Sequence, residues 1–247
     1  MKNYYKFENF IVDVSNKFAY LMAKDVLEEK RYRNNILFIY GDTGVGKTHL
    51  LKAILYKAYK KKSNAKILYI SANELVKELI NAIRNEKYNK FINKYESLDI
   101  LLLDDFQCIT GKERIQTELF TIFSELYNKN KQIIIASNSK PKDIQILAEN
   151  LKKIFEYGIL ADITMQTSET KEAILNNKVK NKKLNVDKET IEYISKKAKL
   201  NIKEMIELVN TVDSYNKLIQ EKMPKKRLDR IIRDITKNHK KHKNHNF

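Results

Sequence analysis

The sequence has a single cysteine and no tryptophan among its 247 residues. One cysteine, Cys108, cannot form an internal disulfide, and it excludes a zinc or iron–sulfur site built from cysteines. Long apolar runs are missing too: the longest, Phe18 to Ala23, has six residues, whereas a membrane-spanning helix needs about 20. The N-terminus lacks the basic and then apolar pattern of a signal peptide. We therefore expect a cytoplasmic protein with no membrane span.

Glycine and proline are scarce, with five and two residues. Glycine is used where the backbone takes a positive φ or must approach another group closely, so each position is informative. Three of the five glycines fall within six residues, at Gly41, Gly44 and Gly46.

A chain of this length makes one to two domains of roughly 150 residues, which can bury a core without disulfides or metals.

The chain is strongly basic, with a formal net charge of +17 and a hydrophobic content of 43%. Such a composition indicates a folded protein and favours an anionic partner such as nucleic acid. However, 41 lysines stand against 7 arginines, and asparagine and isoleucine are abundant as well, which is equally typical of drift in nucleotide composition. Residues 223–247 carry nine Lys or Arg against two Asp, so this segment is basic on either interpretation.

Short apolar runs alternate with segments of helical periodicity through the first part of the chain. Runs such as Ile100–Leu103 and Ile133–Ala136 suit strands buried on both faces, as in a parallel sheet covered by helices. This alternation predicts a doubly wound α/β fold with a parallel sheet. A capping box is expected at Ser71 to Glu74, opening the second helix. The predicted order is strand 36–40, helix 48–61, strand 67–70, helix 74–95, strand 100–104, helix 114–128 and strand 132–137.

The pattern changes at about Thr167, where β-rich runs stop and helical stretches follow, with Pro224 at a predicted break. We therefore expect three parts. They are an α/β nucleotide-binding domain over residues 1–166, a small all-helical lid domain over 167–222, and a basic C-terminal helix or tail over 223–247.

A phosphate-binding loop is the strongest motif in the chain. It matches the P-loop pattern G-x-x-x-x-G-K-[ST] and lies between an apolar strand and a predicted helix. In such a loop, backbone N–H groups surround phosphate oxygens, Lys47 reaches the β and γ phosphates, and the Thr48 hydroxyl is a ligand for Mg²⁺. The candidate cofactor residues of this loop are Gly41, Asp42, Thr43, Gly44, Val45, Gly46, Lys47 and Thr48.

Acidic residues follow the buried strand that ends at Asp104. Asp104 is expected to lie near the metal at the carboxyl end of the strand, and Asp105 to orient or activate the attacking water. Asn138 follows the next apolar strand and is a candidate to bond the γ phosphate or the water. Taken without the P-loop, the pair of aspartates would also be compatible with an exposed turn.

These residues, in this order and spacing, resemble the AAA+ ATPase domain of the bacterial chromosomal replication initiator DnaA family. The resemblance extends from about residue 4 to 220. It is carried by the P-loop and by the strand leading to Asp104 and Asp105. Further matching segments are Phe7–Tyr20, Glu74–Arg84, Gly111–Arg114, Phe155–Gly158, Ser168–Leu175 and Asn201–Glu204.

The resemblance implies an AAA+ P-loop NTPase that binds ATP or ADP with Mg²⁺ and acts in replication initiation or its regulation. It places Val12 and Asn16 against the adenine and ribose, and Lys203 at the second nucleotide sensor. It also implies a path for single-stranded DNA lined by Ile80, Lys112 and Arg114, although ordinary helix packing would explain Ile80 equally well. Partners expected from the resemblance are DNA and a full-length initiator or a second copy of this chain.

Several departures from the family pattern bear on activity. No arginine occurs between Ile115 and Lys226, and Ile154 stands at the position of the family's trans-acting arginine finger. We therefore expect ATP hydrolysis that is slow or dependent on a partner. The sequence has no room for the family's N-terminal partner-binding domain and nothing like its C-terminal helix-turn-helix after residue 220, so specific reading of duplex DNA is not expected.

Two other functions remain open from the sequence. An AAA+ helicase loader also often continues its P-loop with Thr-His-Leu, as Thr48 to Leu50 do here. On any of these readings, His49 is expected on the helix surface. The segment from Phe7 favours the initiator family instead. A non-catalytic interaction module with a structural nucleotide is the other alternative, and the missing arginines favour it.

Overall fold

The computed structural model describes residues 5–28, 35–61, 64–197 and 200–243, with side chains described as far as residue 237. The chain divides into two compact units, Met1–Thr164 and Met165–Phe247. Each unit is considered by itself.

The first unit is built on a five-stranded sheet in which every pair of neighbouring strands is parallel. Their order across the sheet is β2-β3-β4-β1-β5, so the chain crosses over between strands that are not neighbours in sequence. The predicted α/β fold is confirmed. The strands are β1 (Ile36–Tyr40), β2 (Ile67–Ser71), β3 (Ile100–Asp104), β4 (Gln132–Ser137) and β5 (Ile159–Asp162).

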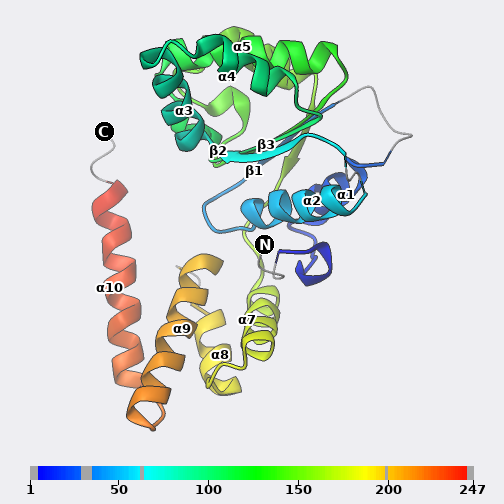
Figure 1. The fold of residues 1–247 in the computed structure, drawn as a ribbon. Coiled ribbons are helices and arrows are strands. Elements are labelled where there is room, and N and C mark those ends of the chain that lie inside the picture. Colours follow the sequence, from blue (N-terminus) through cyan, green and yellow to red (C-terminus); the bar gives the residue numbers. More distant parts are fainter. Residues whose placement is uncertain (1–4, 29–34, 62–63, 198–199, 244–247) are drawn as a thin grey trace. The chain divides into compact units, whose positions relative to one another are not determined.

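Helices cover both faces of this sheet, with α3, α4 and α5 on one face and α1 and α2 on the other (Figure 1). Three short 3₁₀ turns, η1 (Phe7–Asn9), η2 (Phe106–Ile109) and η3 (Pro141–Asp143), lie in the connections. The α-helices of the unit are α1 (Lys17–Asp25), α2 (Lys47–Lys61), α3 (Ala72–Arg84), α4 (Tyr88–Glu96), α5 (Glu113–Asn128) and α6 (Glu149–Glu156).

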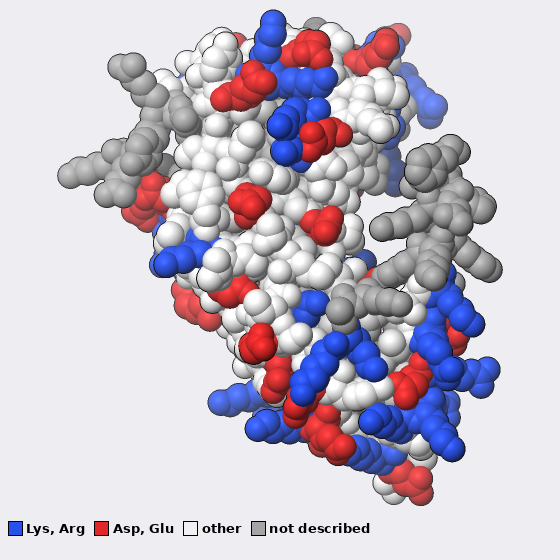
Figure 2. Space-filling model, turned by 180° about the vertical axis from the view of Figure 1, so that it is seen from behind, with Lys and Arg blue, Asp and Glu red and all other residues white. Residues whose placement is uncertain are grey.

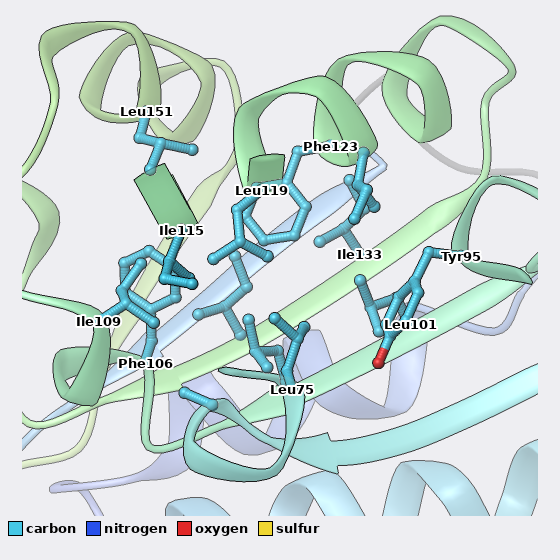
Figure 3. Packing of buried hydrophobic residues seen from close by; sticks show 14 of the residues in the cluster. Leu75, Tyr95, Leu101, Phe106, Ile109, Ile115, Leu119, Phe123, Ile133 and Leu151 are labelled. Atoms are coloured by element: carbon cyan, nitrogen blue, oxygen red, sulfur yellow. The ribbon is translucent and has the colours of Figure 1, made fainter. Parts of the chain in front are cut away.

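Successive residues of each apolar strand are buried alternately in the two hydrophobic cores of the unit. Along β3, Leu101 and Leu103 enter the cluster under α3–α5, whereas Ile100 and Leu102 enter the cluster under α1 and α2. Successive strand residues point to opposite faces, so an uninterrupted apolar run buries both. Figure 3 shows the first cluster, where side chains from α3, α5 and α6 converge on Leu101 and Ile133. This packing holds the ends of β1, β3 and β4 in place.

The predicted single helix over residues 74–95 is two helices in the structure. Helix α3 ends at Arg84 and α4 begins at Tyr88, with Glu86 at φ 55° in the turn between them. The break lets the chain fold back, so that Phe91 and Tyr95 are buried in the same core as Leu75. Because the turn contains neither glycine nor proline, no local signal marked it. The predicted capping box is present: Ser71 and Glu74 bond each other's backbone N–H groups at the start of α3.

Strand β5 and helix α1 were not predicted. Strand β5 has four residues and pairs with β1 through Leu160 and its neighbours. Gly158 precedes it, and a Cβ at Gly158 would lie 2.8 Å from the side chain of Ile36. Glycine is therefore needed where the chain enters the sheet beside β1, a requirement that only the tertiary structure reveals.

All regular secondary structure in the described part of the second unit is helical. Its helices are α7 (Ser168–Lys182), α8 (Lys188–Ser195), α9 (Ile202–Ile219) and α10 (Lys225–Lys243). Side-chain caps at Thr167, Asp187 and Asn201 open the first three, which is the stabilisation that N-terminal N–H groups require. Helix α10 starts after Pro224 and buries Leu228 and Ile232 in the core of this unit. Its basic residues therefore belong to an ordered amphipathic helix, at least to residue 237.

Candidate nucleotide-binding site

The glycine-rich loop connects the end of β1 to the start of α2. Gly41, Gly44 and Gly46 have φ values of 151°, 82° and 115°, a region that side-chain-bearing residues rarely adopt. A Cβ at Gly41 would lie 2.1 Å from the carbonyl oxygen of Ile163. The helix then begins at Lys47, so its first N–H groups and the positive end of its dipole face the loop. This is the local geometry that binds phosphate.

Lys47 is buried in the loop, with 6% of its surface exposed. Its ammonium donates to the carbonyl oxygens of Gly41 at 2.6 Å and Asp42 at 2.8 Å. Burial lowers the pKa of Lys47, while the negative charges of Asp104, Asp105 and Asp42 oppose that shift. The Lys47 ammonium is thus placed to donate to phosphate oxygens in exchange for these two carbonyl oxygens.

Asp104 ends β3 and is 3% exposed. One carboxylate oxygen accepts from the hydroxyl of Tyr69 on β2 at 2.8 Å, and the other accepts from the N–H of Asp105 at 3.0 Å. Burial and the neighbouring Asp104 raise the pKa of Tyr69, so its hydroxyl stays protonated and donates. Sequence reasoning did not find Tyr69, because nothing in its local sequence connects it to Asp104.

A metal site at this position would use Thr48 and Asp104. Thr48 is half-buried in the first turn of α2, and the nearby charge of Asp104 acts on the adjacent Lys47. Hydroxyl and carboxylate oxygens fit Mg²⁺, which commonly takes one or two protein ligands and completes its shell with phosphates and water. Within the described residues, no three His, Cys, Asp or Glu side chains gather into a metal cluster, so a nucleotide would have to supply part of the shell.

Gln107 joins the two residues that the sequence placed in catalysis. Its side-chain amide donates to the carboxylate of Asp105 at 3.3 Å, and its oxygen accepts from the N–H of Asn138 at 3.1 Å. Asp105 itself has φ 55°, which turns the chain away from β3. Gln107 therefore links the residues that follow β3 and β4, and the roles of Asp105 and Asn138 in catalysis stay a prediction.

The segment before α1 packs directly on the loop. A Cβ at Gly46 would lie 3.0 Å from the ring of Phe10. Asn16 is buried, and its side chain bonds the backbone of Ile11 and Asp13, so this amide shapes the turn that carries the exposed Val12. Contact of Val12 and Asn16 with a nucleotide stays a prediction.

His49 does not lie on an open helix surface, as the sequence suggested. Its Nε2 bonds the carbonyl oxygen of Lys6 at 3.0 Å, and its ring meets Tyr5 and Phe10 edge-on at 5.3 Å each. The first segment of the chain covers this face of α2. Helical periodicity does not indicate this contact, because Lys6 and His49 are 43 residues apart in the sequence.

The remaining predicted residues lie apart from the loop or in the other unit. Ile80 is 39% exposed on α3, so it is not an ordinary core residue. Lys112 and Arg114 are exposed around the start of α5. Lys203 is exposed in the first turn of α9, in the second unit, and its role at the nucleotide stays a prediction. Ile154 is buried in the core of the first unit.

The sequence profile of the bacterial DnaA ATPase domain matches residues 1–162. The chain belongs to the bacterial DnaA ATPase family. Membership puts it among AAA+ proteins of the replication-initiation type and agrees with the resemblance drawn from the P-loop and the residues around Asp104.

Solved DnaA structures share both the fold and much of the sequence. Domain III of the Thermotoga maritima replication initiation protein DnaA is 30% identical with a TM-score of 0.88, over 95% of this chain and 98% of that one. AMPPCP-bound DnaA from Aquifex aeolicus is 38% identical with a TM-score of 0.74, over 84% of this chain and 64% of that one. A replication initiator DnaA bound to AMPPCP and single-stranded DNA is 38% identical with a TM-score of 0.76, over 85% of this chain and 65% of that one.

This DnaA-family chain therefore spans about two thirds of the length of two of these relatives. The DnaC helicase loader is 24% identical with a TM-score of 0.57, over 66% of this chain and 99% of that one, a likeness of fold alone. Among the described residues, no helix is both long and apolar enough to cross a membrane.

Proposed function

We propose that this chain binds ATP or ADP with Mg²⁺ and acts in the initiation of chromosomal replication or in its regulation. One observation carries the proposal: a glycine loop ends at the buried Lys47, beside the carboxylate of Asp104 at the end of β3. AMPPCP in two DnaA relatives supports a nucleotide at this loop. The Lys47 ammonium would exchange the carbonyl oxygens of Gly41 and Asp42 for phosphate oxygens.

Each residue of the site has a proposed part. The N–H groups of the loop cradle the phosphates, and Thr48 with Asp104 holds Mg²⁺, which neutralises phosphate charge when bound. Val12 and the turn shaped by Asn16 border the base. Residues 1–166 would form the nucleotide-binding domain, and residues 167–222 a lid that contributes Lys203.

Hydrolysis by the isolated chain would be slow. Asp105 and Asn138 would orient the water from the shared edge of the sheet. Arginine fingers contribute roughly 10³ to 10⁵ in rate in P-loop enzymes, but no arginine occurs between Ile115 and Lys226 and Ile154 is buried. Lysine at position 203 keeps a charge but lacks the planar fork that grips two phosphate oxygens.

DNA is the proposed macromolecular partner, and a full-length initiator or a second copy of this chain is the proposed protein partner. A DnaA relative that holds single-stranded DNA supports the first, with Ile80, Lys112 and Arg114 as candidate contacts. In Figure 2, Lys and Arg side chains crowd the part of the surface over the helices of the second unit, with acidic side chains between them. Lys and Arg side chains bind DNA phosphates without sequence preference, whereas the acidic side chains among them oppose that binding.

Calorimetry with ATP and Mg²⁺ tests the nucleotide proposal. Lys47→Ala should weaken binding at least 100-fold, because the loop amides alone leave the phosphate charge uncompensated. Lys60→Ala, which removes an exposed lysine near the end of the same helix, should bind like the unaltered chain. Equal affinity of all three proteins would contradict the proposal.

A non-catalytic module is the second candidate, favoured by the buried Ile154 and the absence of arginine from this stretch of sequence. Turnover of the pure chain, alone and mixed with an authentic initiator that supplies arginine, separates the two. Stimulation by the initiator supports a catalytic subunit. Bound nucleotide that is never hydrolysed in either mixture supports the module.

A further inference from the structure

Tyr69 reaches across from β2 to the carboxylate that ends β3. The two strands are parallel neighbours, with Ser71 opposite Asp104 in the register, so Tyr69 lies two residues before the end of its strand. Its hydroxyl donates to Asp104 Oδ2 at 2.8 Å. A carboxylate accepts but does not donate, which fixes the direction of this bond.

The ring of Tyr69 is itself held in place. The ammonium of Lys52 on α2 lies 5.3 Å from the centre of the Tyr69 ring and 4.8 Å from that of Tyr5. A cation over an aromatic face is favourable, so Lys52 fixes the ring against the helix that the P-loop opens. The contact with Lys52 therefore holds the Tyr69 ring in the orientation in which its hydroxyl donates to Asp104.

Asp104 needs such a donor because it is almost fully buried and lies near a cation. With 3% of its surface exposed, its carboxylate cannot be solvated by water, and the charge of Lys47 attracts it. Its two bonds, from Tyr69 and from the N–H of Asp105, set the plane of the carboxylate. Without the hydroxyl, the carboxylate would be free to turn toward Lys47 and pair with it.

We propose that Tyr69 is a positioning residue that orients Asp104 for Mg²⁺. The inference rests on the proposed function, in which Asp104 and Thr48 hold the ion that accompanies the nucleotide. When a group that hydrogen-bonds a metal ligand is removed, metal affinity or activity typically falls 10–100-fold. One lone pair on each oxygen of Asp104 is used by Tyr69 and Asp105, and the others remain for the metal or its water.

The same kind of bond occurs elsewhere in the first unit, which provides a matched control. Tyr95 on α4 donates to Glu78 on α3, also at 2.8 Å, and this pair joins two helices. Tyr95→Phe removes the same atom from the same kind of hydrogen bond without touching Asp104. It reproduces the structural effect of losing a hydrogen-bonded hydroxyl from the first unit.

The experiment measures the affinity of the full chain for a fluorescent ATP analogue as Mg²⁺ is varied, with an arm in EDTA. Tyr69→Phe should need about 10-fold more Mg²⁺ for half of the metal-dependent gain in affinity, with its affinity in EDTA within about twofold of the unaltered chain. Tyr95→Phe should match the unaltered chain in both arms. In an Asp104→Asn background, Tyr69→Phe should have no further effect on the Mg²⁺ requirement.

The outcomes separate this inference from the one on which it rests. If the unaltered chain binds nucleotide and responds to Mg²⁺, but Tyr69→Phe behaves like Tyr95→Phe, Tyr69 has no positioning role and the proposed function stands. If Tyr69→Phe loses affinity equally with and without Mg²⁺, its role is structural and the inference is wrong. If the unaltered chain binds no nucleotide, both the proposed function and the positioning role of Tyr69 are wrong.

Discussion

The imidazole of His49 bonds the backbone carbonyl of Lys6, with 3.0 Å between Nε2 and the oxygen. A carbonyl only accepts, so Nε2 carries the proton. The bond fastens the first described residues of the chain to the helix that opens at the P-loop. Tyr5 and Phe10 close around the ring from two sides. The cation could donate the same bond, so it is the burial of the ring under these residues that disfavours its protonated form.

Stability should fall as the pH drops below about 6.5. Burial lowers the pKa of His49 below its ordinary value, and the bond to Lys6 only partly offsets this. The unfolded chain then binds a proton at a higher pH than the folded chain, so stability is fully present above the unfolded pKa of about 6.5 and is lost as the pH falls toward the lower folded value. Urea unfolding at pH 7.5, 6.5 and 5.5 measures this. His49→Gln, which does not titrate here, should flatten the difference, and an unchanged pH dependence would argue against His49 as its source.

Gly41→Ala should destabilise the first unit and remove nucleotide binding. The added Cβ would lie 2.1 Å from the carbonyl oxygen of Ile163, at φ 151°, so the backbone of the loop or of Ile163 must move. A backbone strain of this kind costs about 1–3 kcal/mol before the clash is counted. Gly111→Ala is the control: its φ is 70° and nothing lies within 4 Å of the new Cβ. It should cost about 1 kcal/mol and leave nucleotide affinity unchanged, as measured by denaturant unfolding and calorimetry.

Gln107→Met should slow hydrolysis without weakening nucleotide binding. The substitution removes both the donor to Asp105 and the acceptor for the N–H of Asn138, so neither residue is held against the water. Misplacement by about 1 Å can cost roughly 100-fold, and we expect a loss of at least 10-fold in single-turnover rate. Asp105→Asn should lose as much or more. Gln145→Met, at an exposed glutamine, should have no effect, and a parallel fall in affinity for Gln107→Met would show that the bridge is structural.

DNA binding should depend on the cationic face of α10 and be strongly weakened by salt. Lys226, Arg230, Arg233 and Lys237 are exposed and recur every three or four residues, which places them on one face of the helix. Changing all four to Gln should make the log–log salt slope for duplex DNA shallower by about three to four if each contacts a phosphate. Substitution is preferable to deleting residues 225–247, because Leu228 and Ile232 belong to the core.

A control variant with the same change in net charge tests whether the shallower salt slope results from the loss of the cationic face of α10. It neutralises four exposed lysines of the first unit, Lys60, Lys87, Lys90 and Lys142. If both variants change the slope equally, net charge alone governs binding. Selection of one duplex sequence by about 1,000-fold at physiological salt, as dedicated sequence readers achieve, would contradict non-specific binding.

The features that could be predicted from the amino-acid sequence are those with local signals. Runs such as Ile100–Leu103 predict buried strands because every residue is apolar, and these strands are present in the parallel sheet. The P-loop was recognisable because its glycines, Lys47 and Thr48 act within eight consecutive positions. The capping box at Ser71 follows from two residues three apart. In each case the interacting groups are neighbours along the chain.

The side chains that support the candidate site depend instead on contacts between segments far apart in the chain. Tyr69 reaches Asp104 across 35 residues, Gln107 reaches Asn138 across 31, and His49 reaches Lys6 across 43. None of these residues stands in a pattern that reveals its partner, since strand order and helix packing bring them together. The turn at Glu86 was missed for a related reason, because the burial of Phe91 and Tyr95 against α3 outweighs the helical preference of the residues between them. Long-range contacts obey no sequence period, so a single sequence cannot encode them in a form that local reasoning recovers.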